Sequence, residues 1–242
     1  MKTTKLFSAL VLITLIFGSC KKDDTAVTPA PYICATCTTT PAALAANNAI
    51  SKGIYKGVLI GSTGTIMLDI ANNGTSITAV MVIDGVTVNL TSAVTWVAGI
   101  AYVAPFTGTY NGNPVSITFS VDVNGGNPTV TTSDIPGHPN TTFTIIKETS
   151  TGLVECFEGT YSTTRPETGT FNIILSRGLA AWSGNGRETN TTSDDQVHGT
   201  IVNNQLRADN GIVVGTLSGD QLNGSFVDNN NITITITGTR TF

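Results

Sequence analysis

The sequence predicts an all-β protein of two tandem antiparallel β-meander units, each closing as a small up-and-down barrel. Thr, Ser, Asn and Gly carry its solubility, because charged residues are only 12% of the chain. Thr is β-branched and favours strands, whereas Gly and Asn favour turns. A Gly-x-Tyr segment followed by a Gly-Thr segment also occurs once in each half. A single β-sandwich or one continuous sheet is the alternative architecture.

The first residues have the pattern of a secretory signal. Lys2 and Lys5 form a short positive region, and residues 6–17 are almost entirely apolar. This run is shorter than the about 20 apolar residues that a membrane-spanning helix needs. A charged start before an apolar run of this length is typical of a signal peptide. We expect the signal peptide to comprise residues 1–19.

Small residues stand directly before a cysteine at the end of this run, in the segment Leu15-Ile16-Phe17-Gly18-Ser19-Cys20. The segment resembles a bacterial lipobox, although Phe17 replaces the aliphatic residue usual in that family. The resemblance implies that the signal peptide is removed and that Cys20 becomes the acylated N-terminal residue. Several acyl chains give stable anchoring where one chain does not. The membrane, reached through lipid on Cys20, is therefore an expected partner.

Two short motifs follow Cys20. The cluster Lys21-Lys22-Asp23-Asp24 resembles the surface-export signal of some Gram-negative lipoproteins, and an ordinary solvated linker is the alternative. The triplet Asp24-Thr25-Ala26 resembles a bacterial O-glycosylation acceptor, which implies a sugar on Thr25. These resemblances imply a cell-envelope protein, an outer-membrane lipoprotein that the first motif would display on the cell surface.

Residues 20–40 are rich in Thr, Pro and Ala without a periodic pattern, and we expect them to form a flexible tether. Thr40 and Pro41 then suit the N-cap and first position of a helix. We expect a short helix of two turns over residues 42–49, with Leu44 and Ile50 as its buried contacts. It would lead into a first β-meander domain, residues 41–150.

Short strand patterns separated by turn pairs fill the rest of the chain. Asn-Gly and Asp-Gly pairs suit tight hairpins because both residues tolerate positive φ. In the last strand Ile and Thr alternate, as expected of an antiparallel strand with one apolar face. The expected strands include residues 64–71, 76–83, 86–90, 101–110, 115–123, 199–202, 205–208, 212–217, 221–227 and 232–237.

The internal repeat sets the expected domain boundary. Gly53-Ile54-Tyr55 with Gly64-Thr65 matches Gly159-Thr160-Tyr161 with Gly169-Thr170. We therefore expect a second domain, residues 151–242. The repetition resembles secreted bacterial β-meander domains that end in a Gly-Thr-rich strand, here Thr237-Gly238-Thr239-Arg240. That resemblance implies architecture and no activity.

Three cysteines remain when Cys20 is assigned to lipid. In an oxidising compartment Cys34 and Cys37 could close a small local disulfide. Alternatively, Cys156 pairs with one of them and pins the N-terminal segment to the body. The residue after Cys37 is Thr rather than the His of a haem-attachment motif, and the spacing suits no zinc site. We expect no cofactor and no metal.

Charge argues against nucleic-acid binding. Without Lys2 and Lys5 the chain has 10 Lys and Arg against 16 Asp and Glu, a net charge of −6, and no basic patch. His138 and His198 belong to no nucleophile-elbow motif. Glu155 and Glu158, three apart on a strand, should point to opposite faces, which does not suit a glycosidase.

These observations predict a protein that is not an enzyme. The preferred function is binding of a small hydrophobic ligand or a glycan in a barrel mouth, and the alternative is a structural or adhesive surface protein. A hydrolase is least favoured. Aromatic residues that could line such a mouth are Trp96, Tyr102, Phe106, Tyr110 and Trp182, of which Trp182 has the least bulk beside it.

Overall fold

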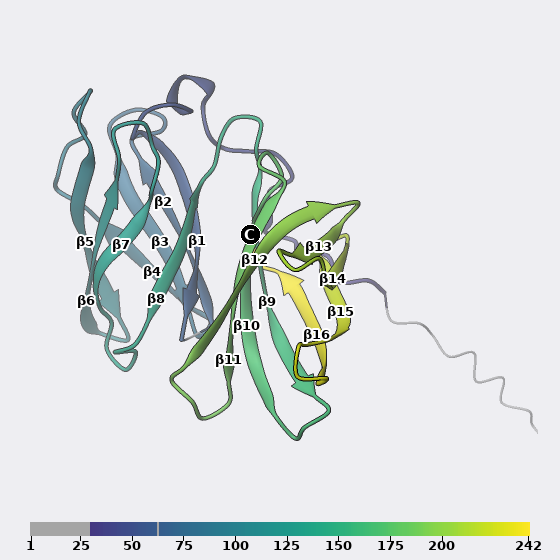
Figure 1. Cartoon of the computed structure of the whole chain (residues 1–242). Helices are drawn as coiled ribbons and strands as arrows, with labels where there is room; N and C mark the ends of the chain where they lie inside the picture. The colour runs from purple at the N-terminus through teal and green to yellow at the C-terminus, as the bar shows by residue number, and fades with distance from the viewer. Residues whose placement is uncertain (1–29, 62) are drawn as a thin grey trace, which may run out of the picture. The chain divides into compact units, whose positions relative to one another are not determined.

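The computed structural model describes residues 30–61 and 63–242 (Figure 1). The protein is all-β, as predicted, with two eight-stranded antiparallel sheets that form one nearly closed and one closed barrel. Within the described residues no helix has the length and apolar character needed to cross a membrane. The signal peptide, Cys20 and Thr25 lie outside the described residues.

The first sheet is a meander in which β8 returns to pair with β1. Its two edge strands, β7 and β8, share no ladder, but the Ser133 hydroxyl donates to the carbonyl oxygen of Thr141 over 3.2 Å. The barrel is therefore nearly closed. Its strands are β1 (Gly53–Ile60), β2 (Gly64–Ile70), β3 (Ile77–Ile83), β4 (Val86–Thr91), β5 (Tyr102–Tyr110), β6 (Asn113–Val121), β7 (Thr129–Asp134) and β8 (Thr142–Lys147).

The second sheet closes completely, because its last strand pairs with its first. A closed barrel leaves no exposed sheet edge. Residues 148–153 join the two sheets. The strands are β9 (Val154–Thr163), β10 (Thr168–Ser176), β11 (Ala181–Glu188), β12 (Asp194–Val202), β13 (Gln205–Ala208), β14 (Val213–Ser218), β15 (Gln221–Val227) and β16 (Thr233–Arg240), drawn in green to yellow in Figure 1.

The predicted N-terminal helix is wrong. Only one turn of 3₁₀ helix forms, η1 (Ala45–Asn47), and Leu44 is 45% exposed instead of buried. The physical reason is a competing amide contact. Asn47 is buried, and its side-chain amide donates to the backbone oxygen of Asn72 (2.9 Å) and to its Oδ1 (3.0 Å). This contact holds the segment against the end of β2, so no second turn follows.

The predicted Asn-Gly and Asp-Gly hairpins are present. Asp84 and Gly85 have φ values of 48° and 76°, and Asn111 and Gly112 have 49° and 79°. Two successive positive φ values match the right-handed twist of the flanking strands. The turn chemistry in the sequence therefore defined where β3 ends and β4 begins, and likewise β5 and β6.

The internal repeat has a different register from the one that the sequence suggested. Tyr55 pairs with Leu68, whereas Tyr161 pairs with Gly169, so the two Gly-x-Tyr segments are not equivalent. Strand pairing instead makes Gly57 equivalent to Gly159. Gly57 on β1 pairs with Ile66 on β2, and Gly159 on β9 pairs with Phe171 at the corresponding position of β10. Tyr161 therefore takes a place nearer the barrel end than Tyr55 does.

The first barrel is filled by its own side chains. Tyr55, Phe106 and Phe119 are fully buried, and their rings meet edge to face at centroid distances of 5.1 and 6.5 Å. Aromatic pairs of this geometry add to the stabilisation from buried area. Of the aromatic residues proposed for a ligand mouth, Phe106, Tyr102 and Tyr110 belong to this core.

The two barrels pack through their outer faces. Every residue of β1 is buried, which requires cover on both sides of the strand. The cover on the outer side is a small apolar cluster in which Val58 contacts Cys156 and Ile174. The amide of Asn172 on β10 also donates to the carbonyl oxygen of Leu59.

A buried ion pair crosses this contact. Lys56 is 2% exposed and Glu148 is 0% exposed, and their charged atoms lie 2.6 Å apart. The same carboxylate accepts the backbone N–H of Ala42 (2.8 Å) and of Val154 (3.2 Å). The ammonium group also donates to the carbonyl oxygen of Val154 over 3.3 Å. One pair therefore joins the N-terminal segment, β1, the connection and β9.

Glu148→Gln should destabilise the protein by about 3–5 kcal/mol, because it leaves the buried Lys56 charge without a counter-charge. Lys56→Met together with Glu148→Gln should recover part of this loss, since no uncompensated charge remains. Urea unfolding followed by circular dichroism measures both. A loss within about 0.5 kcal/mol for Glu148→Gln, the range of ordinary surface substitutions, would contradict the assigned role.

Candidate functional site

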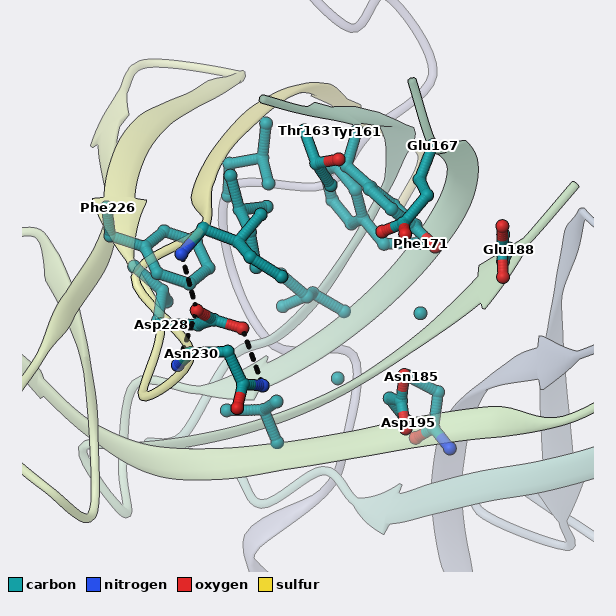
Figure 2. A pocket seen from close by; sticks show the side chains of 18 of the residues that line it. Tyr161, Thr163, Glu167, Phe171, Asn185, Glu188, Asp195, Phe226, Asp228 and Asn230 are labelled. Carbon is teal, nitrogen blue, oxygen red and sulfur yellow. Dashed lines mark hydrogen bonds between the residues drawn. The ribbon is translucent and has the colours of Figure 1, made fainter. Parts of the chain in front are cut away.

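The second barrel holds a cavity of about 380 Å³ near the end where β9 turns into β10. Figure 2 shows the side chains that surround it. This volume lies within the range of about 300–1,000 Å³ that is usual for small-molecule pockets. The cavity is therefore the candidate functional site of the described residues.

Strand register stacks the inner side chains in layers along the barrel axis. The innermost layer, with Leu175 opposite Trp182, is fully packed. Above it, Ile173 faces Gly184, and above that Phe171 faces Gly186. At Gly184 the Ile173 side chain fills the space over the glycine, because an added Cβ would lie 2.6 Å from its Cγ1, whereas at Gly186 no atom comes closer than 3.7 Å. The cavity occupies the half of the barrel that these upper layers surround.

Inner-face glycines have two different roles. At Gly199 and Gly224 an added Cβ would lie 1.9 and 2.1 Å from backbone oxygens of the next strand, so glycine is required for close approach there. At Gly186 an added Cβ would instead lie 3.7 Å from the Tyr161 ring and 4.0 Å from the oxygen of Thr170, ordinary contact distances. Gly186 therefore provides empty volume rather than tight packing.

The cavity changes from apolar to acidic toward its mouth. Its deeper wall is formed by Phe171, Ile173 and Ile236, which are buried. The mouth residues include four carboxylates and one guanidinium group, so the mouth carries net negative charge. These charged residues are Glu167, Glu188, Asp195, Asp228 and Arg165.

Two observations report the local electrostatics of the mouth. Burial raises the pKa of the Tyr161 hydroxyl, and the carboxylates of Glu188, Asp195 and Glu167 raise it further. The Asp228 carboxylate accepts the backbone N–H groups of Ile232 and Asn230, both at 2.8 Å (dashed in Figure 2). Chiefly the Ile232 bond lowers the pKa of Asp228. These shifts favour the ionised form of Asp228 and the protonated form of Tyr161 at neutral pH.

The opposite end of the barrel is closed by a charged cluster. The Arg240 side chain is 5% exposed, and its Nη1 lies 3.4 Å from both Glu155 Oε1 and Asp220 Oδ1. Arg177 pairs with the second oxygen of Glu155. Arg240 ends β16, whereas the cavity residues Ile234 and Ile236 lie nearer the start of that strand. The Arg240 cluster and the acidic residues of the cavity therefore lie toward opposite ends of the barrel.

The N-terminal segment covers this closed end. The hydroxyl of Tyr32 donates to the Arg240 carbonyl oxygen (3.2 Å), and the backbone N–H of Cys34 donates to Asp220 Oδ2 (2.9 Å). The Arg240 guanidinium donates to the carbonyl oxygen of Thr38 over 2.5 Å. Residues expected to belong to a free tether are thus held on the barrel from Tyr32 onward.

The disulfide present in the structure joins Cys34 to Cys37. Cys156 is not part of it, and its thiol is buried against the first barrel with Sγ 3.8 Å from the carbonyl oxygen of Gly57. Burial raises the pKa of the Cys156 thiol. A buried thiol of this kind is unreactive, so Cys156 is a packing residue.

Trp182 is the one aromatic residue of the sequence hypothesis that reaches the cavity. It is 4% exposed, and its indole N–H donates to the carbonyl oxygen of Arg207 over 3.1 Å. Trp96 instead packs on the first core, where its indole N–H donates to Ser51 Oγ over 2.8 Å. Sequence reasoning missed Tyr161, Phe171 and Phe226, and the glycine pair around Asn185 was the available signal for the open wall.

The histidines lie away from the cavity. His138 Nε2 is 3.6 Å from Asp84 Oδ2, and its ring packs on Tyr110. His198 pairs with Asp209 at 2.8 Å, and Ser183 stands opposite His198 on β11. No hydrogen bond links Ser183 to His198 among the described residues, and both members of the His198 pair are 66% exposed. This row therefore lacks the serine–histidine contact that activates a nucleophile.

The two glutamates behave as their spacing predicts. Glu155 faces the inner cluster with Arg240, whereas Glu158 on the outer face accepts the backbone N–H of Gly64 in the first barrel. Burial raises the pKa of Glu158. Across residues 30–61 and 63–242, no three His, Cys, Asp or Glu side chains gather in a way that could hold a metal ion.

No protein-family model, curated protein or solved structure matches this chain.

Neutralising the mouth should lower the pKa of Tyr161. Glu188→Gln should move it toward, but not to, the ordinary value of 10.0, because burial is the larger cause of the shift. Below pH 10.0 the free energy of unfolding contains the full contribution of protonated Tyr161. Above pH 10.0 this contribution declines, because Tyr161 ionises in the unfolded chain before it ionises in the folded protein. NMR titration of ¹³Cζ-labelled tyrosine measures the pKa, with Tyr161→Phe for assignment. An unchanged pKa in Glu188→Gln would show that this carboxylate does not act on Tyr161.

Proposed function

We propose that this protein is a cell-envelope lipoprotein whose β9–β16 barrel binds a small apolar ligand without catalysing a reaction. The cavity above Trp182 is the observation that carries the proposal. Such pockets are usually concave and mostly apolar, with a few polar groups placed to orient the ligand. The barrel meets this description, since its wall is apolar and its mouth is charged.

The lining favours an apolar ligand over a glycan. A sugar needs a hydrogen-bond partner for most of its hydroxyl groups, because a buried polar group without one is costly. The deeper wall offers Phe171, Ile173, Val214 and Ile236, whose side chains have no polar atom. Burial of apolar surface here supplies the affinity, at about 25 cal/mol per Å² before the costs of association.

The other parts of the chain are consistent with binding by the β9–β16 barrel alone. The first barrel is filled by its own aromatic core. The segment from Tyr32 to Thr38 closes the far end of the second barrel. Lipid on Cys20 would keep this barrel at the envelope, and the signal-like residues 1–19 support that part of the proposal.

Filling the cavity should abolish binding. Gly186→Leu places a side chain in the empty volume beside Tyr161, where the backbone has room for a Cβ. Isothermal titration calorimetry with octanol should give measurable binding to the parent chain and none to Gly186→Leu. Gly186→Ala is the matched control and should weaken binding less, because one methyl group fills little of about 380 Å³.

The two variants also test folding. Both should keep the circular dichroism spectrum and thermal midpoint of the parent, since neither introduces a contact shorter than 3.7 Å at Cβ. Unchanged octanol affinity in a folded Gly186→Leu protein would place binding outside the cavity and overturn the proposed site.

Cys20→Ala should remove the anchor. Cells fed labelled palmitate should label the parent chain and leave Cys20→Ala unlabelled, because acylation requires the cysteine. The variant should also leave the membrane fraction. Equal labelling of the two chains would overturn the lipoprotein assignment, and protease treatment of intact cells then distinguishes surface display from an inward-facing anchor.

A further inference from the structure

We infer that the ligand of the β9–β16 cavity is an amphiphilic organic cation, with an apolar tail in the barrel and an ammonium group at the acidic mouth. This inference rests on the proposed binding function and adds the charge class of the ligand. It is carried by the arrangement of carboxylates and aromatic rings around one cavity.

Register places the carboxylates directly across from aromatic rings. Tyr161, Gly169 and Glu188 form one inward-facing row across β9, β10 and β11. Two strand spacings separate Tyr161 from Glu188, about 10 Å between backbones, and Gly169 between them has no side chain. The Tyr161 ring lies over Gly169, because a Cβ added there would be 2.4 Å from Cε1 of that ring, and it therefore extends toward Glu188.

The next row repeats this arrangement one layer deeper. Phe171, Gly186 and Asp195 lie opposite one another on β10, β11 and β12. Gly186 again leaves the middle of the row empty, and its missing side chain forms part of the cavity. A group placed at Gly186 lies beside the Tyr161 ring, whose Cε1 is 3.7 Å from an added Cβ, and next to Asp195 in the row. Figure 2 shows Phe171 and Asp195 on opposite sides of the space.

Both kinds of neighbour attract a cation. Carboxylates attract it by charge, and ring faces attract it through their quadrupole, more strongly when water is excluded. Within the described residues Glu167, Glu188 and Asp195 have no side-chain ion pair or hydrogen bond, so their charges face the mouth uncompensated. Arg165 is the one basic side chain among the lining residues and is exposed.

The mouth suits an organic ammonium rather than a metal ion. The carboxylates do not gather in a group of three that could coordinate a metal among residues 30–61 and 63–242. They stand around the mouth of the cavity, and Phe171 and Phe226 line the same cavity. Dispersed charge and aromatic surface match an organic cation with an apolar tail.

Three probes that share an eight-carbon tail but differ in head group test the charge class of the ligand. Octylammonium, octanol and octanoate differ at the head in charge, and calorimetry at pH 7 compares their affinities for the parent chain. Octylammonium should bind about fivefold to tenfold more tightly than octanol, the size expected for a few partly exposed charge pairs, and octanoate most weakly. Added salt should narrow these differences, since mobile ions screen exposed charges.

Charge-neutral variants test whether the carboxylates at the cavity mouth cause the preference for octylammonium. Glu188→Gln with Asp195→Asn should reduce octylammonium affinity toward that of octanol and raise octanoate affinity, because it removes two of the mouth carboxylates. Asp134→Asn is the matched control, because it removes one exposed carboxylate from β7 of the other barrel. It should change none of the three affinities.

The outcomes separate the two proposals. Octanol binding that Gly186→Leu abolishes, with octanoate equal to or tighter than octylammonium, would overturn the cation inference and leave the binding function standing. Octylammonium preference that survives in the folded Glu188→Gln, Asp195→Asn variant would also overturn it. Absence of binding by any probe to the parent chain would instead overturn the proposed function itself.

Discussion

The buried ion pair between Lys56 and Glu148 is the contact through which the separate parts of the chain meet. Taking two charges out of water costs several kcal/mol per ion, which only close pairing and further hydrogen bonds offset. Here the carboxylate also accepts two backbone N–H groups, from Ala42 and Val154. Those partners belong to the N-terminal segment and to β9, so satisfying one buried charge requires both to be in place. The pair therefore acts as a positional constraint as much as a source of stability.

The two barrels have the same order of strands, but one interior is packed with side chains and the other contains a cavity. In the first, Tyr55, Phe106 and Phe119 meet at the centre. In the second, glycines recur on the inner face. Some let neighbouring backbones approach, as at Gly199, whereas Gly186 leaves volume unfilled. The first barrel therefore has a packed core, whereas the second contains a cavity. The change of register between the repeats contributes, because it moves Tyr161 toward the mouth.

A gradient of polarity runs along the second barrel. The Arg240 cluster and the disulfide segment close one end, the packed layer at Leu175 and Trp182 forms the floor, and carboxylates surround the opening. Charged groups at the closed end are paired, whereas those at the mouth are not all paired.

Local rules in the sequence predicted the all-β class and most of the strands, although β7, β8 and β11 were not among the predicted ranges. Asp84-Gly85 and Asn111-Gly112 specify their hairpins whatever surrounds them, and alternating Ile and Thr specify which face of β16 is apolar. Only the tertiary structure decided the rest. The side-chain amide of Asn47 donates to the backbone oxygen of Asn72, and a single 3₁₀ turn forms in place of the predicted helix. Pairing of β16 with β9 closes the second barrel, and pairing of β10 with β11 places Phe171 across from Gly186. Such contacts join residues far apart in the chain, and their register depends on how whole strands pair, which no local pattern encodes.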